Sequence, residues 1–311
     1  MADYYAATNG TAGGAGTLVS PWDLKTALVN VSQTSDDTLW LRGGIYPQKA
    51  VSLLNGGIVR SYCYQLYGYY DASEYATIDG NATTTLAENI NSSVTEFDVA
   101  STATFAMLGP FDSTDIVIDS EYIRVYSVSG NTITSCDRGF GGTTAASHTN
   151  GATVRVFGMT FIANGNNTTY RDFRVTNSYT LRDAGTAWNV VVPTLLRGGG
   201  IRPGSNTHGN KFVNLAVDNH VDGMGSAPTS YNSEFYGNLM TNNGVHYDGP
   251  PEQGAGNGYY GANASGYFRF YNNISLNNFG FNGQIGDMQG GDFQDNVFAN
   301  AGSPLGGLRD P

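Results

Sequence analysis

The second half of the chain repeats a short unit in which Asn or Asp precedes an aliphatic or aromatic residue, and a further Asn follows four or five positions later. Successive units lie roughly 23 or 24 residues apart, with longer intervals where loops would be inserted, a period typical of one turn of a parallel β-solenoid. Each such turn buries its apolar residues only when it stacks on the next, and Asn side chains at equivalent corners can form a hydrogen-bonded ladder. The units begin at Asp172, Asn214, Asn238, Asn273 and Asn296, their second Asn residues are Asn177, Asn219, Asn242, Asn278 and Asn300, and the aromatic residues just upstream are Tyr170, Phe212, Phe235, Phe270 and Phe293.

Composition narrows the class of protein further. The 311 residues include only 13% charged side chains but 42 Gly and 20 Tyr, which argues against a disordered chain and against a helical protein. The net charge of −11 argues against binding to a nucleic-acid backbone, and an anionic polysaccharide would need a local basic patch or a bridging cation. The sequence has no run of about 20 apolar residues that would span a membrane. Its first residues lack the features of a signal peptide.

One short helix is predicted near the start of the chain. Ser20 can be its N-cap, Pro21 suits the first helical position, and Asp23 can complete a capping box. We expect this helix to cover the open end of the solenoid core, which would otherwise expose apolar side chains and unpaired strand edges. Apolar residues follow at helical spacing: Leu24, Ala27, Leu28 and Val31.

Residues 83–157 interrupt the solenoid pattern. Strand-like runs recur there at short intervals, and Ser129-Gly130-Asn131 is a hairpin turn signal. The sequence therefore predicts three parts: an N-terminal cap with the first turns (1–82), an inserted small antiparallel β module (83–157) and the main solenoid turns (158–311). Cys63 and Cys136 fall in different parts, and two free, packed thiols are favoured over a disulfide.

The opening residues resemble a known superfamily. Asp3-Tyr4-Tyr5, Ser20-Pro21-Trp22 and the stretch Asp37-Thr38-Leu39-Trp40-Leu41-Arg42-Gly43-Gly44-Ile45-Tyr46 resemble the N-terminal end of right-handed parallel β-helix proteins, which include pectate-lyase-like enzymes and phage tailspikes. The resemblance covers residues 1–80 and 158–311. It implies an all-β fold, a right-handed parallel β-helix, whereas fold alone does not determine the reaction.

The interrupting segment has a second resemblance. Ile118-Asp119-Ser120-Glu121-Tyr122-Ile123 and the later stretch from Cys136 through His148 are similar to a small β module common in bacteriophage virion and tail proteins. In that family the module is usually a structural or attachment piece. The resemblance implies a phage or prophage origin, and a structural role for His148.

Two acidic clusters are candidates for catalysis. In an extended stretch alternate residues share a face, so Asp218, His220 and Asp222 could project together. A polar solenoid corner is the alternative for this cluster. The second cluster lies in the largest loop between repeats. This loop could equally be an ordinary exposed loop without a catalytic role. Carboxylates with a histidine can perform acid–base work on a glycosidic bond or bind a divalent cation. The second cluster consists of His246, Asp248 and Glu252.

Aromatic and cationic residues are candidates for substrate binding. The segment 256–263 resembles a Gly-His-Gly-Ile-Tyr element of some β-helix proteins, with Asn257 where that element often has His. Tyr259 or Tyr260 could stack on a sugar ring, although packing inside the solenoid is an alternative, and Asn263 ends the segment. Arg202 could contact substrate, and Arg202 or Lys211 could be a lyase base. The second half of the chain has two further notable cations, Arg182 and Arg197.

These features favour a phage-type or extracellular protein that binds, and in one reading cleaves, a polysaccharide. If it cleaves, hydrolysis by Asp218, Asp222, Asp248 and Glu252 is the favoured reaction. One alternative is a non-catalytic structural or adhesive protein of a virion or filament. Another is a calcium-dependent polysaccharide lyase, with calcium as its cofactor. We expect a homo-oligomer, either a trimer or a filament, at a virion surface or outside the cell.

Overall fold

The computed structural model describes residues 2–30, 37–62, 75–105, 114–178, 199–220, 222–225, 229–244, 257–262, 267–278, 280, 282–286, 290–300 and 308–309. Within these ranges nearly every regular element is a strand, apart from the helix α1 (Leu24–Asn30) and the 3₁₀ turn η2 (Phe140–Gly142). Three sheets contain only parallel strand pairs, and a fourth is antiparallel. The prediction of an all-β chain is thus confirmed for the described residues, none of whose helices is long and apolar enough to cross a membrane.

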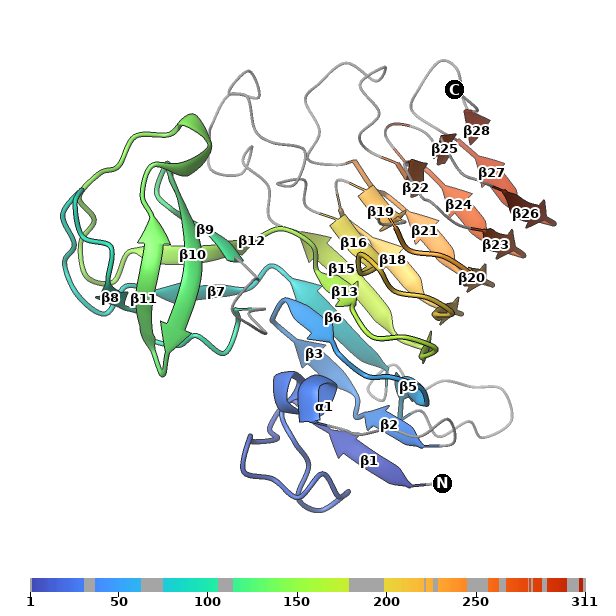
Figure 1. The fold of residues 1–311 in the computed structure, drawn as a ribbon, viewed down its shortest axis with the longest axis horizontal. Coiled ribbons are helices and arrows are strands. Elements are labelled where there is room, and N and C mark those ends of the chain that lie inside the picture. Colours follow the sequence, from blue (N-terminus) through green and yellow to red (C-terminus); the bar gives the residue numbers. More distant parts are fainter. Residues whose placement is uncertain are drawn as a thin grey trace.

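The three parallel sheets, which we call sheets A, B and C, are the sides of one coil (Figure 1). From β13 onward each circuit adds one strand to sheet C, then to sheet A, then to sheet B. Sheet A consists of β1 (Asp3–Ala6), β2 (Thr38–Leu41), β5 (Ile58–Ser61), β14 (Thr169–Arg171), β17 (Lys211–Val213), β20 (Ser233–Tyr236), β23 (Phe268–Tyr271) and β26 (Gly291–Gln294).

The other two sheets have seven strands each. Sheet B consists of β3 (Gly44–Tyr46), β6 (Ala76–Gly80), β15 (Arg174–Ser178), β18 (Ala216–Asp218), β21 (Leu239–Thr241), β24 (Ile274–Leu276) and β27 (Val297–Ala299). Sheet C consists of β4 (Ala50–Ser52), β13 (Phe161–Ala163), β16 (Gly199–Pro203), β19 (Asp222–Gly225), β22 (Tyr259–Ala262), β25 (Gly283–Gly286) and β28 (Leu308–Arg309).

The aromatic residues upstream of each sequence unit form a column inside the coil. Tyr170 and Phe212 stack with ring centroids 5.6 Å apart, and Phe212 and Phe235 with centroids 4.9 Å apart. The column continues through Phe270 to Phe293 at 5.9 and 5.7 Å. Each pair stabilises the stacking of one circuit on the next by about 0.5–1.5 kcal/mol beyond the area it buries.

A single residue with positive φ turns the chain from sheet A to sheet B. Asn and Asp tolerate this left-handed backbone region better than other residues with a side chain, and Asp172 (φ 58°) and Asn214 (φ 53°) occupy it. The next position carries the ladder: Asn238 Nδ2 donates to Asn273 Oδ1 at 2.9 Å, and Asn273 Nδ2 donates to Asn296 Oδ1 at 3.1 Å.

The sequence units therefore combine two different positions. Asn214 Nδ2 donates to Asp172 Oδ1 at 2.9 Å, so this pair also bonds between circuits. Grouping the pair in one column with Asn238, Asn273 and Asn296 was wrong by one residue, because Phe173 and Leu215 stand at that position and are buried in the core. A second ladder closes sheet B, where Asn243 Nδ2 donates to Asn278 Oδ1 at 2.9 Å. Side-chain amides thus replace the buried Phe173 and Leu215 at the first corner in the later circuits, whereas the earlier circuits already have buried polar residues, Ser178 and His220, at the second.

The helix α1 begins one residue after Asp23, which is its N-cap. Asp23 Oδ1 accepts a hydrogen bond from the Thr26 backbone N–H at 2.8 Å, so the prediction of Ser20 as N-cap was wrong. The Ser20 hydroxyl instead accepts from Ala15 N at 3.3 Å. The helix packs against β4, and its apolar residues Leu24, Ala27 and Leu28 belong to the core of the coil; Val31 lies outside the described residues.

The antiparallel sheet stands beside the coil (Figure 1). The chain leaves the coil after β6 and rejoins it at β13. This sheet has its own apolar core, and the predicted turn joins β10 to β11 with Ser129 paired to Thr132. In order across the sheet, its strands are β7 (Thr83–Thr85), β12 (Thr153–Phe157), β9 (Thr114–Ile118), β10 (Glu121–Ser129), β11 (Thr132–Asp137) and β8 (Phe97–Asp98).

The described cysteine, Cys136, is a buried free thiol in this sheet. Burial raises the pKa of the Cys136 thiol to about 11, so it is protonated and unreactive near neutral pH. The prediction of a free, packed thiol is confirmed for Cys136. Cys63 lies outside the described residues.

Candidate functional site

Several of the predicted site residues lie on adjacent strands of sheet C. Arg202 is on β16, Asp222 begins β19, and Tyr259 and Tyr260 begin β22. Alternate residues of a strand face opposite sides of a sheet, and Ile201 and Met224, which pair in register, both point into the core. Arg202 and Gly225 therefore lie side by side on the outer face of sheet C, where Gly225 in turn pairs with Tyr260.

Arg202 is the distinctive cation of this face. Its side chain is largely removed from solvent, and this burial lowers the pKa of the guanidinium, which nevertheless stays charged. Its Nε is buried without a hydrogen-bond partner among the described residues. A charged donor left in this state costs more than the 1–3 kcal/mol typical of an unsatisfied neutral group. The outer face of sheet C thus presents positive charge that an anionic group can satisfy.

Asp222 lies at the start of the next strand and is held by Asn257. Asp222 Oδ1 accepts hydrogen bonds from the backbone N–H of Asn257 at 3.0 Å and from its Nδ2 at 3.1 Å. Asn257 is fully buried. Asn257, which stands where the Gly-His-Gly-Ile-Tyr element often has His, therefore orients a carboxylate here. Asp222 itself is half-buried at the start of β19.

The remaining members of the first acidic cluster are not on sheet C. Asp218 lies on the outer face of sheet B, where both carboxylate oxygens are 2.9 Å from nitrogens of Arg174 and the Thr176 hydroxyl donates to Oδ1. His220 is completely buried at the following corner, with Nε2 3.2 Å from the carbonyl oxygen of Val175. Alternation along a single strand predicted that Asp218, His220 and Asp222 share a face. In the structure the chain turns a corner after β18, so Asp218 and Asp222 lie on different sheets.

Tyr259 is a core residue. It is buried against Phe235 and Phe270, with ring centroids 5.3 and 4.6 Å apart, so the packing alternative holds for its ring. The side chain of Tyr260 is not among those described. His246, Asp248, Glu252 and Asn263 lie outside the described residues, as do Arg182 and Arg197. Lys211 is on sheet A, where its Nζ lies 3.2 Å from Glu234 Oε2.

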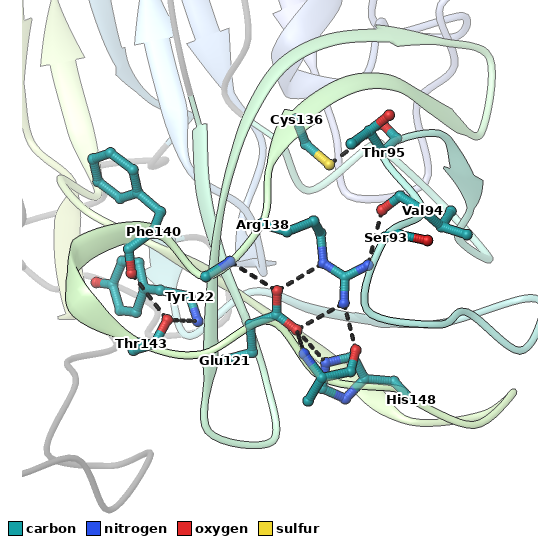
Figure 2. Close-up of polar contacts among 12 residues, drawn as sticks. Ser93, Val94, Thr95, Glu121, Tyr122, Cys136, Arg138, Phe140, Thr143 and His148 are labelled. Atoms are coloured by element: carbon teal, nitrogen blue, oxygen red, sulfur yellow. Dashed lines mark hydrogen bonds and ion pairs between the residues drawn. The ribbon is translucent and has the colours of Figure 1, made fainter.

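The antiparallel sheet contains a buried ionic network that sequence reasoning did not assemble. Figure 2 shows Glu121 at its centre, with Arg138 on one side and His148 on the other. Glu121 accepts two hydrogen bonds from Arg138, both at 2.7 Å, and one each from Gly139 N and Ala146 N at 2.9 Å. His148 Nε2 lies 2.8 Å from Glu121 Oε2. Glu121 thus ties together the loops that carry Arg138, Ala146 and His148.

The pKa of Glu121 reflects that network. Burial alone would raise it, but the hydrogen bonds from Arg138, Ala146 N, His148 and Gly139 N outweigh burial and lower the pKa to about 2. Arg138 also donates to the carbonyl oxygens of Asn91 and Val94 at 2.8 and 2.9 Å. A carboxylate so fully engaged holds structure rather than reacting with a substrate.

No group of three or more His, Cys, Asp or Glu side chains that could hold a metal ion occurs among the described residues. The carboxylates of the second acidic cluster lie outside those residues, so a calcium site built from them is a matter for experiment. Chelation is the direct test of that alternative.

A scan against protein-family models finds no match for the chain, and a search of curated proteins finds none either. Among solved structures, that of XylC in complex with xylose is 11% identical and covers 96% of this chain and 63% of that one, with a TM-score of 0.46. Pectate lyase Pel9A is 12% identical over 98% of this chain and 78% of its own, with a TM-score of 0.39.

The tailspike protein gp49 from Pseudomonas phage LKA1 is 12% identical over 87% of this chain and 54% of its own, with a TM-score of 0.24. The chain thus spans less than two thirds of the XylC chain and about half of the tailspike. A pectate lyase and a tailspike are the two kinds of protein that the opening residues resemble. At these identities and scores, the likenesses say nothing of this chain's substrate or reaction.

Proposed function

We propose that this chain is a right-handed β-helix protein that binds an acidic polysaccharide along the outer face of sheet C, with Arg202 as the contact for a sugar carboxylate. The observation that carries the proposal is the state of Arg202, a largely buried guanidinium whose Nε has no partner among the described residues. Arg presents a planar fork of donors that matches a carboxylate in two hydrogen bonds. A uronate sugar supplies such a group.

The charge of the whole chain sharpens this requirement. A protein with a net charge of −11 repels a polyanion at long range, and this repulsion is screened beyond about 8 Å at physiological ionic strength. A contact at short range with a poorly solvated cation can outweigh it, because Coulomb attraction strengthens where water is excluded. We therefore expect binding to strengthen at moderate salt, in contrast to ordinary attraction between opposite charges.

Cleavage is the second part of the proposal. Asp222 is a half-buried carboxylate at the start of β19 on the same sheet, and its orientation by Asn257 suits it to acid–base work. Asp248 and Glu252 lie in the connection between β21 and β22 and are proposed as its partners in hydrolysis. Asp218 and His220 are left out, because one is engaged by Arg174 and the other is buried in the corner.

Binding without cleavage is the competing function. The observation that favours it is that Asp222 is the single carboxylate among the described residues of the sheet C strands, whereas acid–base hydrolysis of a glycosidic bond uses a pair. In that case the chain would be an adhesive part of a virion or filament. A trimer or filament, a location at a virion surface or outside the cell, and an attachment role for residues 83–157 belong to the proposal in either form, as does α1 as a cap on the coil.

The test of function uses a panel of neutral and uronate-containing polysaccharides with calcium present. New reducing ends and the ultraviolet absorbance of an unsaturated sugar are followed together. Reducing ends alone indicate hydrolysis, both signals together indicate a lyase, and loss of activity on chelation would favour the calcium-dependent lyase. Under hydrolysis, Asp222→Asn removes cleavage and Asp218→Asn retains it. Bound polymer without either signal indicates the adhesive function, and neither binding nor cleavage across the panel would contradict the proposal.

A further inference from the structure

Exposed aromatic side chains gather on the outer face of sheet A in its later circuits and just before its strands, away from sheet C. Tyr231 and Tyr236 lie before and at the end of β20, and Tyr267 and Tyr271 lie before and at the end of β23. Tyr231, Tyr236 and Tyr267 are 42%, 43% and 40% exposed. We call these four residues, together with His208, the tyrosine surface.

The rings of the tyrosine surface are arranged in pairs across neighbouring circuits. His208 and Tyr231 stack with centroids 5.2 Å apart and planes 15° apart. Tyr236 and Tyr271 lie in register, with centroids 5.3 Å apart. Neighbouring parallel strands are about 4.8 Å apart, close to the length of a pyranose unit, so successive circuits offer aromatic contacts at the repeat of a sugar chain.

A row of charges crosses the strands between these rings. Lys211, Glu234, Arg269 and Asp292 are aligned in register on β17, β20, β23 and β26, so that positive and negative side chains alternate. Glu234 lies 3.2 Å from Lys211 and 3.0 Å from Arg269, and hydrogen bonding to Asp292 raises the pKa of the Tyr267 hydroxyl. The row is neutral in sum and offers both donors and acceptors.

We propose that the tyrosine surface is a second carbohydrate-binding surface, and that it takes neutral sugar units. A partner of strong charge gains little here, because each charge of the row already has an opposite neighbour. A second copy of the chain, with its net charge of −11, gains little for the same reason. Sugar hydroxyls, which donate and accept, match the row, and the apolar faces of sugar rings match tyrosine rings that combine an apolar body with a polar tip.

This inference concerns a face of the coil other than sheet C, and it stands or falls independently of Arg202. Exposed apolar patches rimmed by polar residues mark interaction sites or ligand-binding grooves. The aligned side chains continue toward the first circuits: Arg60 lies over the Trp40 ring, 5.1 Å from its centroid, on the same outer face. A long polymer can therefore contact more than the five residues that define the surface.

The test is affinity electrophoresis of the full chain in native gels that contain a galactomannan, an arabinoxylan or a mixed-linkage β-glucan. We expect at least one polymer to retard the protein. The double variant Tyr236→Ala/Tyr271→Ala weakens that retardation about tenfold, a factor equivalent to about 1.4 kcal/mol. Tyr236→Phe/Tyr271→Phe retains most of it, because the ring faces remain.

The matched control is Leu239→Ala/Ile274→Ala, which removes exposed apolar residues from the same two circuits on sheet B; it should be retarded like the wild type. Retardation by none of the three polymers would overturn the inference, as would equal retardation of the wild type and the tyrosine-to-alanine variant. Arg202→Ala should keep this retardation while it loses binding to polygalacturonate. Loss of both in Arg202→Ala would show one site where we infer two.

Discussion

Replacing Glu121 by Gln should destabilise the antiparallel sheet strongly. Glu121 is 1% exposed and its carboxylate accepts five hydrogen bonds from Arg138, two backbone N–H groups and His148. Glu121→Gln preserves the size of the side chain. Its amide NH₂ group, however, would face N–H groups that are themselves donors, so these hydrogen bonds are lost. The substitution also leaves the buried Arg138 guanidinium without a counter-charge. Removing one partner of a buried ion pair costs about 3–5 kcal/mol.

The matched control is Asp119→Asn. Asp119 also contacts His148, with Oδ2 2.7 Å from Nδ1, but its side chain is 68% exposed. A contact of this exposed kind is worth about 1 kcal/mol or less. Each variant therefore replaces one carboxylate that contacts His148: Glu121 is inside the buried network, and Asp119 is at its exposed edge.

Hydrogen exchange followed by mass spectrometry measures the difference at neutral pH. Peptides that cover β9, β10, β11 and β12 should exchange about a hundredfold faster or more in Glu121→Gln, since each 1.4 kcal/mol corresponds to a factor of ten. Asp119→Asn should change the rate by less than about tenfold, and peptides of the coil should be unaffected in both. Equal rates in the two variants would refute the reasoning.

The pKa of Glu121 gives this network a pH dependence of definite sign. Its pKa is about 2 in the folded chain and has an ordinary value of 4.5. The unfolded chain therefore takes up the proton first as pH falls. The stabilisation is complete above about pH 4.5 and is lost as pH falls through about 2. Thermal unfolding of the wild type should show this loss between those limits, and Glu121→Gln should lack it.

Three further predictions concern the coil. Asp218→Asn should lower stability by about 1.5–3 kcal/mol, because it weakens charged hydrogen bonds from Arg174 and Thr176, yet leave polysaccharide binding unchanged in a titration. Asn273→Ala should lower the thermal midpoint more than Asn272→Ala, because Asn273 is buried and hydrogen-bonded to both ladder neighbours. Asn272→Ala places alanine at a φ of 56°, which costs about 1–2 kcal/mol of stability. The reverse order of midpoints would contradict the ladder. Lys49 is buried, and burial lowers its pKa to about 7. Between about pH 7 and 10.5 the unfolded chain therefore binds more protons than the folded chain, and stability should rise with pH. The increase in thermal midpoint from pH 7 to pH 9.5 should be smaller in Lys49→Met than in the wild type.

The coil could be predicted from the sequence because its pattern is physical and periodic. The aromatic column of Tyr170, Phe212 and Phe235 follows from the requirement that each circuit bury the same position. The register of the corners could not be fixed, because Asn serves both as the residue with positive φ and as the ladder residue one position later. The backbone conformation separates the two roles, since Asn214 and Asn272 have positive φ and Asn273 does not.

The candidate site could be predicted in part. Arg202 and Asp222 lie on the same sheet because β16 and β19 are the sheet C strands of successive circuits. Asp218 and His220 were grouped with Asp222 by alternation along a strand, and alternation ends where the chain turns a corner. The tyrosine surface was missed although its signal is present: Tyr236 and Tyr271 each follow the buried aromatic of their circuit by one residue, and they must therefore face outward.

The central claim is that Arg202 contacts an acidic sugar on the outer face of sheet C. The most direct measurement is calorimetric titration of the full chain with oligosaccharides of polygalacturonate and of alginate, for the wild type, Arg202→Lys and Arg202→Ala, with Arg155→Ala of the antiparallel sheet as control. The account predicts that the wild type and Arg155→Ala bind at least one of the two, that Arg202→Lys binds it more weakly, and that Arg202→Ala binds it at least tenfold more weakly still. Undiminished binding by Arg202→Ala, or no binding of either acidic sugar by the wild type, would contradict it.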